Sequence, residues 1–86
     1  MKPVVMYSTR VCPYCVRAEM LLKQRGVVSL EKILVDMLPD EKNRMIERTG
    51  RRTVPQIFIG DVYVGGCDDL YELDHKGELV KLLSGD

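Results

Sequence analysis

The first 35 residues alternate between two short apolar runs and one helical pattern, and this alternation constrains the fold more than any other feature. Residues 3–8, Pro-Val-Val-Met-Tyr-Ser, are typical of a central strand buried on both faces. Apolar residues then recur with helical spacing over 15–22, and Gly26 stands where such a helix would end. Residues 30–35 form a second strand-like run. A strand, a helix and a strand in this order predict a right-handed crossover between parallel strands.

The remainder of the chain adds two helices and a hairpin to this unit. Residues 39–50 begin with proline and acidic residues and end with glycine, the signals of a second helix. Residues 57–59 and 62–64 are apolar runs around a Gly-Asp pair, the pattern of a β-hairpin. Residues 68–83 predict one last helix, whose apolar face continues past Gly77. The order β-α-β-α-β-β-α predicts an α/β domain, with helices on both faces of a small mixed sheet.

Length and charge narrow the class of protein further. The chain has 86 residues, which fit a single domain spanning 1–86. Thirteen Lys and Arg residues balance thirteen Asp and Glu residues, which argues against a nucleic-acid partner. No apolar run approaches the roughly 20 residues of a membrane span, and no signal-peptide pattern follows Met1. We therefore expect a soluble monomer in the cytoplasm, without a membrane partner.

The three cysteines are too few, and odd in number, for a secreted disulfide scaffold. Cys12 and Cys15 lie between the first strand and the first helix, at the carboxyl end of that strand, where parallel sheets present their chemistry. Cys12 is expected at the helix N-cap, where free N–H groups and the helix dipole favour a thiolate and lower its pKa. Pro13 suits the first helical position, and Cys15 falls one turn inside the helix. Cys12 is thus predicted to attack a disulfide and Cys15 to resolve the product, with Arg10 adding positive charge nearby.

The same cysteine spacing also occurs in half of a zinc knuckle. Cys67 and His75 could supply the third and fourth ligands of a Cys3His site. Closed zinc sites usually pair two short ligand clusters, whereas Cys67 and His75 have seven residues between them and lie far downstream of Cys15. The position after a strand and at a helix start therefore favours dithiol redox chemistry, and no metal is expected.

Three motifs in order resemble those of the dithiol glutaredoxins: Cys-Pro-Tyr-Cys at 12–15, Thr-Val-Pro-Gln-Ile-Phe-Ile-Gly at 53–60 and Gly-Gly-Cys-Asp-Asp at 65–69. The resemblance spans most of the chain. It implies a thioredoxin-like fold whose four-stranded mixed sheet has the order 2-1-3-4. It also implies a glutathione-disulfide oxidoreductase that reduces protein disulfides and protein–glutathione mixed disulfides. Glutathione would be the cosubstrate, recycled by glutathione reductase, and ribonucleotide reductase is a client of the family.

The resemblance further implies where glutathione binds. The backbone of Val54 would pair with the cysteinyl part of glutathione, like an added strand. Thr53 belongs to the same segment, and Pro55 would follow a cis peptide bond that turns the Val54 backbone outward. Tyr14 would lie along the glutathione backbone.

The γ-glutamyl end of glutathione would meet the third motif. Backbone N–H groups of Cys67 and Asp68 at a helix start suit its carboxylate, and the Asp69 carboxylate would meet its amino group. Asp68 and Asp69 also fit helix capping and dipole compensation, and both roles can hold together. Cys67 is interpreted as a small packing residue rather than a second redox centre.

One departure from the family concerns the glycine end of glutathione. Many relatives have a lysine three residues before the nucleophile, where Thr9 stands here. Arg10 could replace it, and Arg51 or Arg52 could also reach the glycine carboxylate. For each arginine, ordinary surface charge is the alternative.

Two other functions share parts of this pattern. A glutaredoxin-like electron donor reduced by thioredoxin reductase has the same fold but usually lacks the motifs at 53–55 and 67–69. An iron–sulfur cluster-binding module would hold a cluster between two subunits through Cys12 and glutathione, and Pro13 disfavours it.

Overall fold

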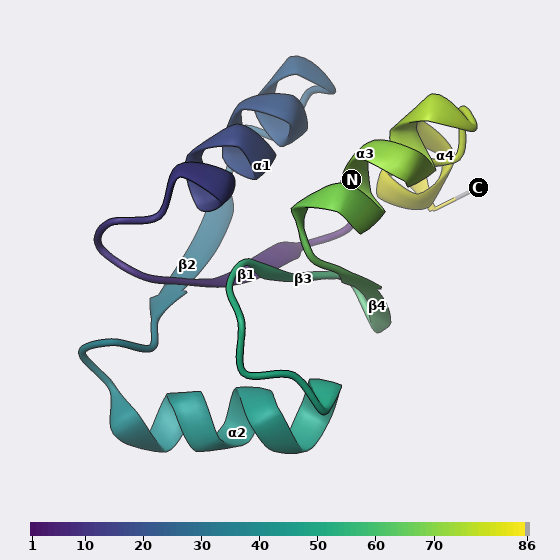
Figure 1. Cartoon of the computed structure of the whole chain (residues 1–86). Coiled ribbons are helices and arrows are strands. Elements are labelled where there is room, and N and C mark those ends of the chain that lie inside the picture. Colours follow the sequence, from purple (N-terminus) through teal and green to yellow (C-terminus); the bar gives the residue numbers. More distant parts are fainter. Residues whose placement is uncertain (86) are drawn as a thin grey trace.

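The computed structural model describes residues 1–85, so Asp86, predicted in the same domain, lies outside the described residues. Figure 1 shows helices on both faces of a single sheet, as predicted. In chain order the elements are β1 (Val4–Ser8), α1 (Pro13–Gln24), β2 (Leu30–Leu34), α2 (Pro39–Thr49), β3 (Gln56–Ile59), β4 (Val62–Gly65), α3 (Cys67–His75) and α4 (Leu79–Ser84).

The four strands are arranged in the order β2-β1-β3-β4, which confirms the predicted topology. β1 pairs in parallel with β2 and antiparallel with β3, and β4 completes an antiparallel hairpin with β3. Residue Val4 illustrates the central place of β1, because it lies opposite Leu30 on one side and Ile59 on the other. Because β1 and β2 are parallel, their carboxyl ends lie at the same end of the sheet, and the Cys-Pro-Tyr-Cys segment follows β1 there.

Side chains of β1 alternate between two cores because a strand points successive residues to opposite faces. Val4 and Met6 join the larger core, which α1, α3 and α4 cover. Tyr7 joins a smaller core with Met45 of α2 and Phe58 of β3. Figure 1 shows α2 alone on this second face. Burial on both faces explains why β1 reads as a continuous apolar run.

The second strand is shorter and more exposed than predicted. β2 ends at Leu34, and Val35 follows it, donating its N–H to the Ser8 carbonyl at 2.9 Å. Ile33 and Leu34 are only half-buried, because β2 is an edge strand with just one neighbouring strand. The prediction of a buried run at 33–35 therefore holds only for Val35, which is 5% exposed, and is wrong for Ile33 and Leu34.

The single C-terminal helix predicted over 68–83 is also wrong. Gly77 has φ +74° and ends α3, while α4 begins separately at Leu79. The Gly77 N–H donates to Asp74 and the Glu78 N–H to Leu73, the paired bonds of a glycine-terminated helix end. The apolar spacing hides this break, since Leu79 packs into the same core as α3.

The turn from β4 into α3 depends on Gly65. Its φ is +117°, a conformation that side-chain-bearing residues rarely adopt. A Cβ at this position would also overlap the Asp69 carboxylate, which folds back over the turn. The glycine thus lets the first turn of α3 approach the end of β4.

We predict that Gly65→Ala destabilises the protein more than Gly50→Ala does. Gly50 also has positive φ, +73°, but a Cβ there meets no atom within 4 Å. Gly50→Ala therefore measures conformational strain alone, about 1–2 kcal/mol, and Gly65→Ala adds the steric overlap with Asp69. Urea unfolding followed by circular dichroism compares the two variants. An equal or smaller loss at position 65 would contradict the close approach.

Candidate active site

The Cys-Pro-Tyr-Cys segment joins the carboxyl end of β1 to the start of α1. Cys12 is the helix N-cap, with extended backbone angles, and Pro13 follows at the first helical position. The Cys12 carbonyl accepts the N–H of Val16 at 3.1 Å, which closes the first helical turn. Both predicted positions are confirmed.

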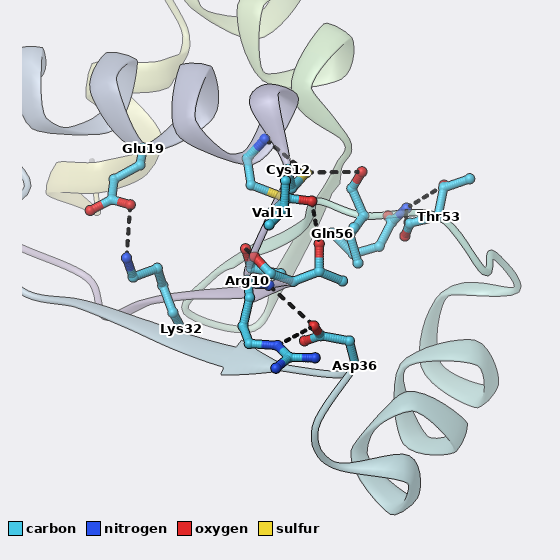
Figure 2. The surroundings of a disulfide bond; sticks show 12 residues. Arg10, Val11, Cys12, Glu19, Lys32, Asp36, Thr53 and Gln56 are labelled. Carbon is cyan, nitrogen blue, oxygen red and sulfur yellow. Dashed lines mark hydrogen bonds and ion pairs between the residues drawn. A yellow bond between two sulfur atoms is a disulfide. The ribbon is translucent and has the colours of Figure 1, made fainter.

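Cys12 and Cys15 form a disulfide, with their Cα atoms 5.2 Å apart (Figure 2). The Cys15 N–H donates to the Cys12 sulfur at 3.1 Å, as the N-cap position allows. Cys12 is half-buried, whereas Cys15 is only 3% exposed. The two sulfurs thus differ in accessibility in the predicted sense, and an incoming reactant meets Cys12 first.

A second segment, distant from Cys12 in the sequence, lies close to it in the structure. The Val54 carbonyl oxygen lies 3.9 Å from the Cys12 sulfur, although 42 residues separate the two positions. The Val54–Pro55 peptide bond is cis, as predicted. The segment before β3 therefore forms one wall of the space beside the disulfide.

A groove of about 190 Å³ runs along this wall. Seven of the nine residues predicted to bind glutathione line it: Tyr14, Thr53, Val54, Pro55, Cys67, Asp68 and Asp69. The groove also contains three residues that were not among those nine: Arg51, Gln56 and Gly66. Segments from the start of α1, the loop before β3 and the start of α3 thus meet at one surface.

Asp69 occupies the α3 end of the groove and makes two hydrogen bonds. Its Oδ2 accepts the Gly66 N–H at 2.8 Å, the bond of a helix capping box, and Arg51 Nη1 at 3.1 Å. The Gly66 N–H, and after it Arg51, hold the pKa of the Asp69 carboxyl below its usual value. The carboxylate is therefore charged at neutral pH, and the capping role considered for it is observed.

Cys67 and Asp68 begin α3 beside Asp69. Cys67 is 5% exposed and packs into the larger core, and burial raises the pKa of its thiol. The protonated thiol fits the interpretation of Cys67 as a packing residue. Asp68 is exposed in the first turn, where a negative charge compensates the helix dipole.

The three arginines considered for the glycine carboxylate lie in different places. Arg10 donates its Nε to Asp36 at 2.8 Å and does not line the groove (Figure 2). This bond with Arg10 lowers the pKa of Asp36. Arg52 is exposed and does not line the groove either. Arg51 does line it, but its guanidinium is directed at Asp69, at the α3 end.

A second hollow of about 460 Å³ borders the disulfide between α1 and β2. Cys12 and Cys15 line it together with Arg10, Glu19 and Lys32. Figure 2 shows Glu19 and Lys32 on one side of Cys12 and Thr53 on the other. Lys23 and Lys32 both bond to Glu19, at 3.0 and 3.1 Å, and lower its pKa.

Gln56 is the groove residue to which the sequence analysis gave no role. Its side chain is 1% exposed and donates Nε2 to the Thr53 carbonyl at 3.0 Å and to the Thr53 hydroxyl at 3.2 Å. The Tyr63 hydroxyl donates to Gln56 Oε1. One signal was present in the sequence: a glutamine begins an otherwise apolar strand, where a buried amide needs partners.

The zinc alternative needs Cys12, Cys15, Cys67 and His75 in one place. Among residues 1–85, no three or more His, Cys, Asp or Glu side chains form a group that could hold a metal ion. His75 lies at the exposed C-terminal end of α3. In the same range, no helix is long and apolar enough to cross a membrane.

Comparisons with known proteins agree with this geometry. The glutaredoxin family model matches residues 4–64. A glutaredoxin of Pseudomonas aeruginosa is 48% identical over 84 residues, covering 98% of this chain and 99% of that protein. Glutaredoxin 3 of Escherichia coli K12 is 48% identical over 83 residues, 96% of this chain and 99% of the relative. The crystal structure of a buckwheat glutaredoxin–glutathione complex superposes with a TM-score of 0.88 at 36% identity, covering 98% of this chain and 78% of that one. With its Cys12–Cys15 pair, the chain belongs to the glutaredoxin family of thiol–disulfide oxidoreductases, in the dithiol class.

Proposed function

We propose that this protein, acting as a single domain of residues 1–86, uses glutathione to reduce protein disulfides and protein–glutathione mixed disulfides. The observation that carries the proposal is the groove that seven predicted glutathione-binding residues line, one of which, Val54, has its carbonyl oxygen 3.9 Å from the Cys12 sulfur. The similar buckwheat structure is a glutaredoxin–glutathione complex, which supports the same ligand.

The chemistry begins with a thiolate at Cys12, once the Cys12–Cys15 disulfide has been reduced. The start of α1 supports that thiolate, because the Cys15 N–H is directed at the Cys12 sulfur and the positive end of the helix dipole lies there. The thiolate attacks the glutathione sulfur of a mixed disulfide, and the substrate protein leaves as a thiolate. A second glutathione thiolate then attacks the Cys12–glutathione bond. This releases oxidised glutathione and restores the Cys12 thiolate.

Cys15 serves the second route, the reduction of protein disulfides. After Cys12 has formed a mixed disulfide with the substrate protein, the Cys15 thiolate attacks the Cys12 sulfur and releases the reduced substrate. The burial of Cys15 fits this role, since its sulfur needs to reach only Cys12. Two glutathione molecules then reduce the Cys12–Cys15 disulfide.

The groove offers matching groups for two parts of glutathione. The Val54 carbonyl lies 3.9 Å from the Cys12 sulfur, which supports pairing of the Val54 backbone with the cysteinyl residue. At the α3 end, the γ-glutamyl group carries both an ammonium and a carboxylate. Asp69 suits the ammonium, while the N–H groups of Cys67 and Asp68 and the guanidinium of Arg51 suit the carboxylate.

The cellular setting follows from this reaction. Oxidised glutathione returns to the reduced form through glutathione reductase, so the electrons come from NADPH. Disulfide-bonded or glutathionylated proteins are the substrates, ribonucleotide reductase among the candidates. The cytoplasm, with its reduced glutathione pool, is the compartment that suits the reaction.

We predict turnover of a glutathionylated protein, such as glutathionylated serum albumin, in the presence of glutathione, glutathione reductase and NADPH. NADPH consumption, followed by absorbance, measures the rate, and the assay without this protein is the blank. Turnover with thioredoxin reductase and NADPH but not with glutathione would favour the alternative electron donor. A brown chromophore in anaerobically purified protein would favour the iron–sulfur alternative.

We predict that replacing the two cysteines separates the two routes. Cys12→Ser abolishes both activities, because no other exposed thiol stands at the site. Cys15→Ser keeps the reduction of glutathione mixed disulfides within severalfold of wild type. It loses protein-disulfide reduction through the dithiol route, which insulin reduction measures. If Cys15→Ser were inactive in both assays, the proposed division of roles would be wrong.

We predict that Asp69→Asn raises KM for a glutathionylated peptide about tenfold with little change in kcat, the scale of one lost charged hydrogen bond. The asparagine keeps an oxygen that can accept the Gly66 N–H, so the helix cap is retained. Asp68→Asn is the matched control, because its side chain is exposed and only its backbone N–H is assigned to glutathione. Equal effects of the two substitutions would refute the role of Asp69.

A further inference from the structure

The segment that would bind glutathione is followed directly by a buried polar side chain. Gln56 begins β3, immediately after the cis Val54–Pro55 bond, and is 1% exposed. Its neighbours in the strand are apolar and equally buried. A buried amide without hydrogen-bond partners is costly, so the partners of Gln56 show what it does there.

The partners of Gln56 hold the segment before it. The Thr53 carbonyl can only accept hydrogen bonds, so the amide nitrogen of Gln56 faces Thr53 and its oxygen faces the Tyr63 hydroxyl. Both amide hydrogens are used on Thr53, one for its carbonyl and one for its hydroxyl, at 3.0 and 3.2 Å. The side chain of Gln56 thus ties the backbone two residues before Pro55 to the sheet.

Tyr63 is itself fixed by rigid elements. Tyr63 of β4 lies opposite Phe58 of β3, and their ring centroids are 5.1 Å apart. On the same face, the guanidinium of Arg48 in α2 stacks 4.0 Å from the Phe58 ring centroid and bonds to the Tyr7 hydroxyl at 2.9 Å. The Tyr63 hydroxyl is therefore aimed at Gln56 by the β-hairpin and by the core under α2, not by a loop.

We propose that Gln56, oriented by Tyr63, is a positioning residue that sets the Thr53–Val54 backbone for glutathione. The proposal rests on the proposed function, because it concerns the same groove. The Val54 carbonyl lies 3.9 Å from the Cys12 sulfur, so a shift of this segment displaces the surface that pairs with the cysteinyl residue of glutathione. The side-chain hydrogen bonds of Gln56 and Tyr63 run to Thr53 and to each other, whereas the Cys12 sulfur accepts the Cys15 N–H. Loss of the hydroxyl therefore weakens binding and leaves the chemical step intact.

Tyr63→Phe tests this role with the smallest change, since the ring stays against Phe58 and only the hydroxyl is lost. Tyr71→Phe is the matched control: Tyr71 donates its hydroxyl to the Arg17 carbonyl at 3.3 Å and lies outside the groove. We expect Tyr63→Phe to raise KM for a glutathionylated peptide fivefold or more. Its kcat and the rate of Cys12 alkylation by iodoacetamide stay within twofold of wild type. For Tyr71→Phe, the KM, the kcat and the alkylation rate all stay within twofold of wild type.

A second variant and a direct measurement of backbone motion test whether the rise in KM comes from the binding segment rather than from a general loss of stability. Gln56→Glu keeps an acceptor for Tyr63 but loses both donors to Thr53, and the same rise in KM is expected. In Tyr63→Phe without glutathione, the backbone order parameter of Val54 measured by 15N relaxation falls, while those of β1 and α1 do not. If Gln56→Glu does not fold, the KM and the Val54 order parameter of Tyr63→Phe alone test the proposal.

The results separate this inference from the function on which it rests. A wild-type protein that does not turn over the glutathionylated peptide overturns the proposed function and this inference with it. An active wild type with Tyr63→Phe unchanged in KM and in the Val54 order parameter overturns the inference alone. A loss of kcat at unchanged KM also overturns it, since positioning of the binding segment acts through KM.

Discussion

The double pairing of β1 is the constraint on which the rest of the structure depends. β1 is hydrogen-bonded to β2 on one side and β3 on the other, and its side chains enter both cores. A strand held in this way has no freedom to slide, because a shift of one residue would exchange its two apolar faces. Its last residue, Ser8, therefore delivers the chain to α1 at a fixed point, and Cys12 begins that helix at the edge of the sheet.

The other site segments reach that edge through the same sheet. β3 is antiparallel to β1, so its first residues, preceded by Thr53–Pro55, lie beside the end of β1. β4 runs back along β3, and the close turn at Gly65 brings the start of α3 to the same edge. Two segments that lie 40 or more residues after Cys12 in the sequence, Thr53–Pro55 and the start of α3, thus meet it without a long loop. The groove is a consequence of strand order rather than of any single motif.

The local features of this site could be predicted from the sequence. Three such features depend only on neighbours within one helical turn, and all three are confirmed: the start of α1, the position of Pro13 and the difference in burial between Cys12 and Cys15. The groove residues came from the resemblance, because spacing alone cannot place residue 54 beside residue 12. What escaped prediction depends on distant partners: Arg10 pairs with Asp36, 26 residues away. The apolar spacing also continued across Gly77, where a left-handed glycine ends α3, so two helices were taken for one.

The ion pairs around the disulfide affect how strongly its surroundings attract or repel an approaching molecule. Arg10 is paired with Asp36 and Arg51 with Asp69, while Glu19 faces two lysines, which leaves one positive charge unbalanced there. The opposite charges of a one-to-one pair largely cancel at a distance, so the Arg10–Asp36 and Arg51–Asp69 pairs contribute little to long-range attraction or repulsion of a partner. These two pairs act on a partner only through contact at short range. By charge, therefore, these two pairs do not distinguish acidic from basic molecules that approach the disulfide.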